Sequence, residues 1–302
     1  MCQRFNFSLL SDRLKFGLHF AGGAFALIGI VYIYKRINLH AAEINLAVFN
    51  ASIWAVLAIL ATVYGLANLM LAQAWQKILK HFGVSVAVPW AIWAYGVSQI
   101  AKYIPGNIFH LAGRQALGAA AGLPQWPLAK STLWELGLIA SAGTILGLLV
   151  LPLLTEYVTP SGNLVLFVSI SVLTLIVFKH IYSREIVLAF FYYLGFLLIS
   201  GILFIGLIEL FSARTAEIEV KDWLPLIGAY VVAWLAGFIT PGAPAGIGVR
   251  ELVLLFLLKG ILGETELLMA VAIGRLVTSS GDGLFFIASS IYGRRFFSKA
   301  SI

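Results

Sequence analysis

The chain has 302 residues, of which 61% are hydrophobic and 11% are charged, and its formal net charge is +7. Its mean hydropathy of +0.98 is far above that of an ordinary water-soluble domain, so we expect an integral membrane protein. The single cysteine, Cys2, excludes an internal disulfide and any multi-cysteine metal site, and no two of the five histidines stand at metal-ligand spacing.

The first apolar segment covers residues 17–34 and follows three cations, Arg4, Arg13 and Lys15. This order resembles the start of a signal peptide. However, a run of 18 residues is longer than a usual signal core, and no Ala-x-Ala cleavage pattern follows it. We therefore expect an uncleaved first span, preceded by a cytoplasmic N-terminus at residues 1–16.

Five further apolar runs are long enough, or nearly long enough, to form membrane helices. A helix needs about 20 apolar residues to cross the roughly 30 Å hydrocarbon layer. Together with the first segment, these runs predict about six transmembrane helices. They cover residues 45–72, 128–154, 163–178, 186–211 and 267–291.

Two other apolar regions, residues 87–123 and 223–262, are each interrupted by Pro-Gly. The pieces beside each break have about 14 to 17 residues, so each covers only about 21 to 26 Å at 1.5 Å per residue, a little short of a crossing. We expect two re-entrant helical hairpins. The alternative is two pairs of short, tilted spans whose turns lie outside the membrane. The residues expected to form the breaks are Pro105, Gly106, Asn107, Pro241, Gly242, Gly246 and Gly248.

The loop charges indicate the orientation of the chain. With the N-terminus inside, eleven lysines and arginines fall in inner segments and five in outer segments, as the positive-inside rule requires. Both termini, including the tail at residues 292–302, should then be cytoplasmic. The first hairpin enters from the cytoplasmic face and the second from the outer face.

This layout predicts one transmembrane domain, residues 1–302, that contains two inverted repeats. The repeat units, residues 45–154 and 186–291, each consist of a span, a hairpin and a span, and residues 163–178 connect them. In each unit an arginine, Arg114 or Arg250, stands eight positions after the glycine of the Pro-Gly break. Interrupted hydrophobic segments in corresponding places of two halves are typical of transport sites at mid-bilayer. The predicted fold class is therefore an all-α polytopic membrane protein.

Eight ionisable residues remain at membrane depth after the loops are assigned, and their formal charges sum to zero. An isolated charge at the centre of a span costs about 2.5 to 3.5 kcal/mol, so most of these groups must be paired, hydrated or near an interface. Six cluster in or just after the hairpins, which predicts a polar cavity between them. Glu209 and Lys102 are the weakest members, because each could extend to a nearby surface. The eight are Lys102, Arg114, Glu135, Glu209, Arg250, Glu251, Arg275 and Asp282.

The breaks also predict an anion site. A helix that restarts after each break would direct free amides at mid-membrane, with Asn107 placed to cap the first, and arginine adds a fork that can hold phosphate. The alternative is that Arg250 pairs with Glu251 or Asp282, and Arg114 with Glu135, only to hold the hairpins; the two interpretations can coexist. The predicted substrate-binding residues are Arg114, Arg250, Glu251, Arg275, Glu135, Asp282 and Lys102.

Three segments occur in a recognisable order: SQIAKYIPGNIFHLAGR at residues 98–114, PGAPAGIGVRE at 241–251 and GRLVTSSGD at 274–282. Through them the chain resembles the lysylphosphatidylglycerol synthase transmembrane-region family, which includes the flippase part of the multiple peptide resistance factors and stand-alone relatives. The resemblance implies movement of a lipid or lipid-linked head group between leaflets. Because the sequence ends at Ile302, eleven residues after the last expected span, we do not expect the aminoacyl transfer of that family's acyltransferase domain.

The predicted function is therefore a lipid flippase, not an enzyme, in a bacterial or archaeal cytoplasmic membrane. Its expected partners are the membrane and an anionic phospholipid, polyprenyl lipid or glycolipid; no cofactor, metal or nucleic acid is expected. The alternative is a membrane-embedded transferase, because Glu135, Glu251 and Asp282 could supply acid-base chemistry. Against it, the sequence has no Gly-x-x-x-x-Gly-Lys loop, no nucleophile elbow and no paired-aspartate motif. An assembly subunit would explain the hydrophobicity but not the duplicated charges.

Overall fold

The computed structural model describes residues 49–104, 108–211 and 220–300, together with five single positions between residues 27 and 38. Within these residues the protein is helical, and no strand is present. Apart from the single positions, the predicted first span at residues 17–34 lies outside the described residues. The predicted N-terminal segment at residues 1–16 and the break residues Pro105, Gly106 and Asn107 also lie outside them.

The first half of the described chain contains two long helices and one broken region. The helix α2 begins after Asn50, whose side-chain oxygen accepts a hydrogen bond from the amide of Ile53 at 3.0 Å and so caps the helix. The elements are α2 (Ala51–His81), α3 (Val88–Gln99), the 3-10 helix η2 (Ile100–Tyr103), α4 (Phe109–Ala120), α5 (Gln125–Gly147), the 3-10 helix η3 (Leu148–Val150) and α6 (Leu151–Leu154).

The second half repeats this order after a connecting helix, α7 (Pro160–Ile181). A long helix, α8, precedes a broken region, and a long helix, α11, follows it. The elements are α8 (Arg184–Phe211), α9 (Val220–Ile239), the 3-10 helix η4 (Pro244–Gly246), α10 (Val249–Leu257) and α11 (Glu264–Ala300).

Six helical segments of the described chain are long and apolar enough to cross a membrane, which confirms the predicted class of all-α polytopic membrane protein. Five of them correspond to predicted spans: Ala51–His81, Gln125–Leu154, Pro160–Ile181, Arg184–Phe211 and Glu264–Gly293.

The sixth segment, Asp222–Ile239, belongs to α9, which is the first arm of the second broken region. This arm has 20 residues and is longer than predicted, because the helix starts before the apolar run and includes Lys221 and Asp222. A helix satisfies its backbone hydrogen bonds internally, so it can continue through polar residues beyond the apolar stretch. Its partner arm, α10, has only nine residues.

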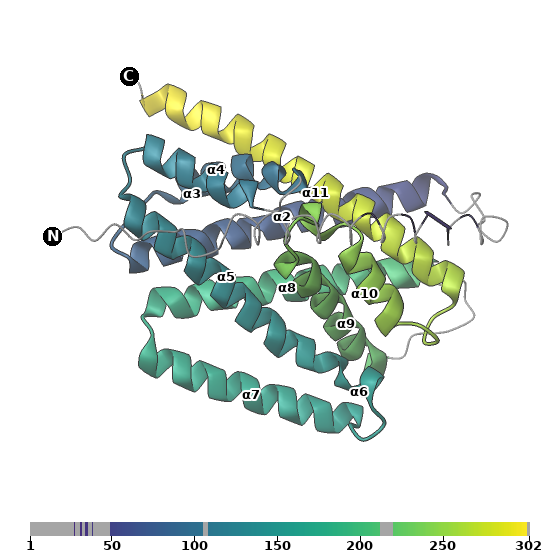
Figure 1. Ribbon diagram of the computed structural model, residues 1–302. Coiled ribbons are helices and arrows are strands. Elements are labelled where there is room, and N and C mark those ends of the chain that lie inside the picture. The colour runs from purple at the N-terminus through teal and green to yellow at the C-terminus, as the bar shows by residue number, and fades with distance from the viewer. Residues whose placement is uncertain are drawn as a thin grey trace.

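The helix α8 lies at the centre of the bundle, between α2 and α11 on one side and α5 and α9 on the other (Figure 1). The end of α2 and the start of α8 meet at one end of the molecule. There Glu185 pairs with Lys80 at 2.7 Å and Lys77 at 3.3 Å, and His81 Nδ1 lies 2.7 Å from Ser183 Oγ. The two helices are therefore antiparallel.

Both broken regions are hairpins, because α3 packs on α4 and α9 packs on α10. They enter the bundle from opposite ends, and their breaks, η2 and η4, are in contact near its middle (Figure 1). Each half therefore has a long helix, a hairpin and a long helix, with the second half inverted relative to the first. Which end is cytoplasmic stays a prediction from the loop charges.

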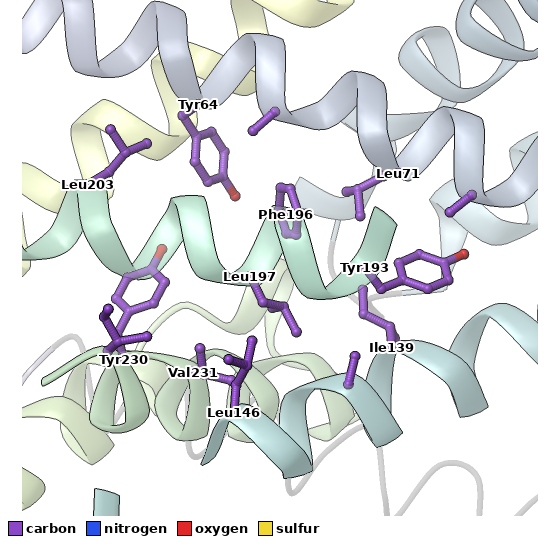
Figure 2. Packing of buried hydrophobic residues seen from close by; sticks show 14 of the residues in the cluster. Tyr64, Leu71, Ile139, Leu146, Tyr193, Phe196, Leu197, Leu203, Tyr230 and Val231 are labelled. Atoms are coloured by element: carbon purple, nitrogen blue, oxygen red, sulfur yellow. The ribbon is translucent and has the colours of Figure 1, made fainter. Parts of the chain in front are cut away.

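The interior of the bundle is filled by large side chains on α8 and its neighbours. Figure 2 shows Phe196 and Leu197 of α8 between Tyr64 of α2 above and Leu146 of α5 below. The rings of Tyr64 and Phe196 lie 5.8 Å apart. Because lipid tails are as apolar as these side chains, close packing rather than exclusion from water holds the helices together.

The connecting helix α7 lies at the edge of the bundle (Figure 1), and Asn163 is the one buried residue of this helix. The side-chain amide of Asn163 donates to the carbonyl oxygen of Leu149 at 3.1 Å, which attaches the start of α7 to η3. Most of the other residues of α7 are apolar and exposed or half-buried, which suits a helix at the lipid-facing edge.

Candidate functional site

A polar cavity of about 70 Å³ lies where the two hairpins meet. A space of this size holds a few water molecules. Five of the seven predicted binding residues line it, and the other two, Arg114 and Glu251, are each paired with a residue that does. The polar and ionisable residues of its wall are Tyr64, Tyr95, Gln99, Lys102, Tyr103, His110, Glu135, Arg250, Arg275, Thr278 and Asp282.

The first ion pair joins the second arm of the first hairpin to α5. Arg114 Nη1 donates to Glu135 Oε2 at 2.7 Å and to Oε1 at 2.9 Å, and both side chains are buried. Tyr95 of α3 donates to Glu135 Oε1 at 2.9 Å, and its ring lies 4.1 Å from the guanidinium carbon of Arg114. This pairing is the structural alternative expected from the sequence, and it ties α3, α4 and α5 together.

The second ion pair joins the first hairpin tip to α11. Lys102 Nζ lies 2.7 Å from Asp282 Oδ2, and Tyr103 donates to the same oxygen at 2.6 Å. The side-chain amide of Asn68 donates to Asp282 Oδ1 at 3.3 Å. The position of Lys102 in the sequence would have allowed it to extend to a surface, but it does not do so. It is held inside because Asp282, which is 1% exposed, supplies a nearby opposite charge.

The third ion pair joins the second hairpin to α11. Arg275 Nε lies 3.4 Å from Glu251 Oε1, and Arg275 Nη2 donates to the carbonyl oxygen of Ala245 in η4 at 2.8 Å. Arg275 and Asp282 are seven residues apart on α11, which is about 10.5 Å along one face of the helix. One face of α11 therefore holds the tips of both hairpins.

Arg250 differs from the other three cations. Within the part of the chain that the structure describes, it forms no ion pair; its Nη2 donates to the hydroxyl of Tyr230, and its guanidinium carbon lies 4.4 Å from that ring. The expected partners Glu251 and Asp282 are instead paired with Arg275 and Lys102. Arg250 is 7% exposed and is one of the residues that line the cavity.

Glu209 is the only one of the eight predicted intramembrane charges that is exposed. It lies near the end of α8, which agrees with the prediction that it could reach a surface. The other seven comprise four cations and three carboxylates, and each carboxylate is paired with a cation. The neutral total expected from the sequence therefore becomes one excess positive charge around the cavity, located at Arg250.

The helix start after the second break differs from the predicted amide site. There Glu251 Oε2 accepts the amide hydrogen of Gly248 at 2.6 Å, so the carboxylate of the chain itself occupies the start of α10. At the first break, α4 begins at Phe109, and the predicted cap Asn107 lies outside the described residues. The amide site at the first break therefore stays a prediction.

The glycines of the second break adopt conformations that other residues rarely do. Gly242, Gly246 and Gly248 have φ values of +85°, +73° and +85°. At Gly246 an added Cβ atom would lie 2.7 Å from the Cα atom of Gly237, so the break also packs directly on α9.

Several polar residues of the cavity were not predicted. Tyr95 and Gln99 stand seven and three positions before the predicted Lys102, which places all three on one face of the first arm, and this spacing is a signal that the sequence contains. Gln99 and His110 are both buried, and Gln99 Oε1 and His110 Nδ1 have no hydrogen-bond partner among the described residues.

A second, apolar cavity of about 460 Å³ lies between α2, α3 and α11. Its rim includes Leu66, Leu284 and Tyr292, which are exposed on the outside of the bundle. This cavity differs from the polar one in its chemistry. A hydrocarbon chain of the bilayer can enter it and remain in an apolar environment.

The chain matches no protein-family model, and no curated protein is significantly similar to it.

Proposed function

We propose that this protein moves a lipid with an anionic head group between the two leaflets, through the cavity at the hairpin tips. The observation that carries the proposal is Arg250, a buried cation that lines the cavity and lacks a carboxylate partner among the described residues. A charge at this depth is expensive to leave uncompensated, and a bound anion would compensate it. The resemblance to a lipid flippase family leads to the same class of substrate.

Phosphate is the anion that best suits the site. A guanidinium can hold two phosphate oxygens through parallel hydrogen bonds, and lipid head groups carry phosphate at the membrane surface. Lys102 and Arg275 lie on the same cavity wall and offer further donors. The tails of such a lipid would stay in the hydrocarbon layer while the head group passes the tips.

The size of the cavity indicates how movement would occur. About 70 Å³ is too small for a lipid head group, so the two tips must part before one can pass. The tips enter from opposite ends of the bundle and are held to α11 through Asp282 and Arg275. Small opposed movements of the hairpins would then open the cavity first to one side and then to the other.

A transferase is the second candidate, but the carboxylates give it less support. Glu135 accepts hydrogen bonds from Arg114 and Tyr95, and Asp282 accepts from Tyr103 and pairs with Lys102. These donors from the protein itself already occupy oxygens of both carboxylates, which leaves the carboxylates poorly placed to exchange a proton with a substrate. The arrangement therefore favours binding over acid-base chemistry.

The decisive experiment uses the purified full chain in liposomes. Tail-labelled phosphatidylglycerol is placed in one leaflet, its appearance in the other is followed over time, and the lipid is then recovered for mass analysis. We expect transfer of chemically unchanged lipid, faster than in protein-free liposomes and without ATP. Recovery of a modified lipid would favour the transferase, and no transfer above the protein-free rate would exclude the flippase.

A further inference from the structure

The charges around the polar cavity indicate the net charge of the ligand as well as its sign. Arg114, Lys102 and Arg275 are each paired with one carboxylate, and Arg250 is left with a tyrosine hydroxyl. The break residues that the structure does not describe, 105–107, are Pro, Gly and Asn and carry no ionisable side chain. Counted over the described residues that line the cavity or pair with its lining, the side chains carry a net formal charge of one positive unit.

The cavity histidine does not change this count. His110 is 8% exposed, and no carboxylate pairs with it among the described residues. A charged imidazole at such a site would be both poorly solvated and unpaired, so the neutral form is favoured. The tyrosines of the wall are neutral hydroxyls that can donate to a phosphate without adding charge.

From this charge balance we infer that the protein selects lipids whose head group carries one net negative charge, a phosphodiester with no ammonium group. This inference rests on the proposed function and names the substrate class of the same cavity. A phosphodiester has one ionised oxygen and neutralises the charge of Arg250. With such a lipid bound, every charge in the cavity has a partner.

Two other common classes of lipid fit the cavity less well. A zwitterionic head group brings an ammonium, but the three described carboxylates at the cavity, Glu135, Glu251 and Asp282, are each already paired with a cation of the protein. A phosphomonoester carries about 1.5 to 2 negative charges near neutral pH and would leave an excess of negative charge. In a site with a low dielectric constant both mismatches slow transfer, because unpaired charges are costly there.

The test compares three lipids that differ only in the head group. The purified chain is placed in liposomes made mainly of phosphatidylcholine, with a trace of tail-labelled phosphatidylglycerol, phosphatidylcholine or phosphatidic acid, whose net charges are about −1, 0 and −2. We expect the wild-type protein to transfer phosphatidylglycerol faster than either alternative, by a ratio on the order of tenfold. This comparison requires no variant.

Variants then locate the source of the selection. Arg250→Gln makes the cavity neutral, so the ratio of phosphatidylglycerol to phosphatidylcholine transfer should fall toward one, whereas Arg250→Lys should keep it. Glu209→Gln is the matched control, because it also removes one charge but lies on the exposed end of α8. Its ratio should equal that of the wild type.

The possible outcomes separate this inference from the proposed function. Wild-type transfer of phosphatidylcholine or phosphatidic acid at the rate of phosphatidylglycerol overturns the charge selection and leaves the flippase intact. An Arg250→Gln protein that elutes as a folded species and retains the wild-type ratio also overturns it. If no lipid moves at all, the proposed function fails and the charge selection fails with it.

Discussion

The buried cations of this protein have different partners, and this difference determines what the loss of each would do. Arg114 is 2% exposed and its charge is balanced by Glu135, so it belongs to the support of the first hairpin. Arg250 is balanced by no carboxylate in the described chain, and its partner Tyr230 is neutral. Two arginines at equivalent places in the two repeats therefore have unequal roles.

Removal of Arg114 should destabilise the protein. Arg114→Gln leaves Glu135 buried without its cation, and breaking a buried pair in this way typically costs about 3 to 5 kcal/mol. Thermal unfolding in detergent should show this loss, and the double variant Arg114→Gln with Glu135→Gln should recover most of it. A single variant as stable as the wild type would contradict the support role.

Removal of Arg250 should affect transport more than stability. Arg250→Gln leaves only the hydroxyl of Tyr230 without its partner, a cost of about 1 to 3 kcal/mol. We expect a folded protein that no longer moves phosphatidylglycerol above a small fraction of the wild-type rate, and Arg250→Lys should restore part of the rate because it keeps the charge without the fork. A folded Arg250→Gln protein with the wild-type rate would exclude Arg250 from the transport site.

At the scale of elements, α11 holds both hairpin tips and must itself be held in place. It crosses α2 at Gly65 and Gly281, where the two backbones touch. A Cβ atom added at Gly281 would lie 2.6 Å from the carbonyl oxygen of Ala61. Small residues at such a crossing allow the close approach that packs membrane helices.

Overpacking this crossing should loosen the attachment of α11. Gly281→Ala forces α2 and α11 apart, and overpacking of this kind costs about 1 to 3 kcal/mol. The matched control is Gly283→Ala on the same helix, where no atom lies within 4 Å of the added Cβ. In thermal unfolding Gly281→Ala should be clearly less stable than Gly283→Ala; equal stabilities would show that the crossing tolerates a larger separation.

The arrangement of the hairpins predicts which side of the membrane the ends of each hairpin reach. Both ends of the first hairpin should be accessible from one side, and both ends of the second from the other. Single cysteines at Ala87, Ala121, Trp223 and Lys259, all exposed, test this on a background without Cys2. Labelling of Ala87 and Ala121 from opposite sides would make the first hairpin a pair of spans.

At the scale of the whole molecule, two inverted halves meet at a small cavity that is lined by the hairpin tips and the surrounding helices. The tips η2 and η4 are in contact, and each is attached to α11 by one polar side chain, Asp282 or Arg275. If the proposed transport is correct, we expect exchange of these few polar contacts to move the tips, so alternate exposure of the cavity would need no nucleotide-binding domain.

A cross-link between the tips should therefore stop transport. One cysteine in η2 and one in η4, on the Cys2-free background, should form a disulfide that abolishes lipid transfer, and reduction should restore it. The two single-cysteine variants serve as controls for the substitutions themselves. Unchanged transfer in a fully cross-linked sample would favour a fixed groove along which head groups slide.

Much of this architecture could be predicted from the sequence. The membrane class, five spans, the places of the two breaks and the identities of the charged residues follow from length, hydropathy and the positions of Pro-Gly, which are local properties of the chain. The end of α9 at Ile239, just before Pro241, is one example, since this break depends only on neighbouring residues of the chain.

Of the three ion pairs described at the cavity, the sequence offered only Arg114 with Glu135 as an alternative, and the other two could not be predicted in this way. Glu251 stands next to Arg250 in the chain but pairs with Arg275, and Asp282 pairs with Lys102 from the other half. Adjacent residues on a helix point in different directions, so chain proximity does not make them partners. The packing of both hairpins on α11 decides that these charges meet, and it leaves Arg250 at the cavity without a carboxylate partner among the described residues.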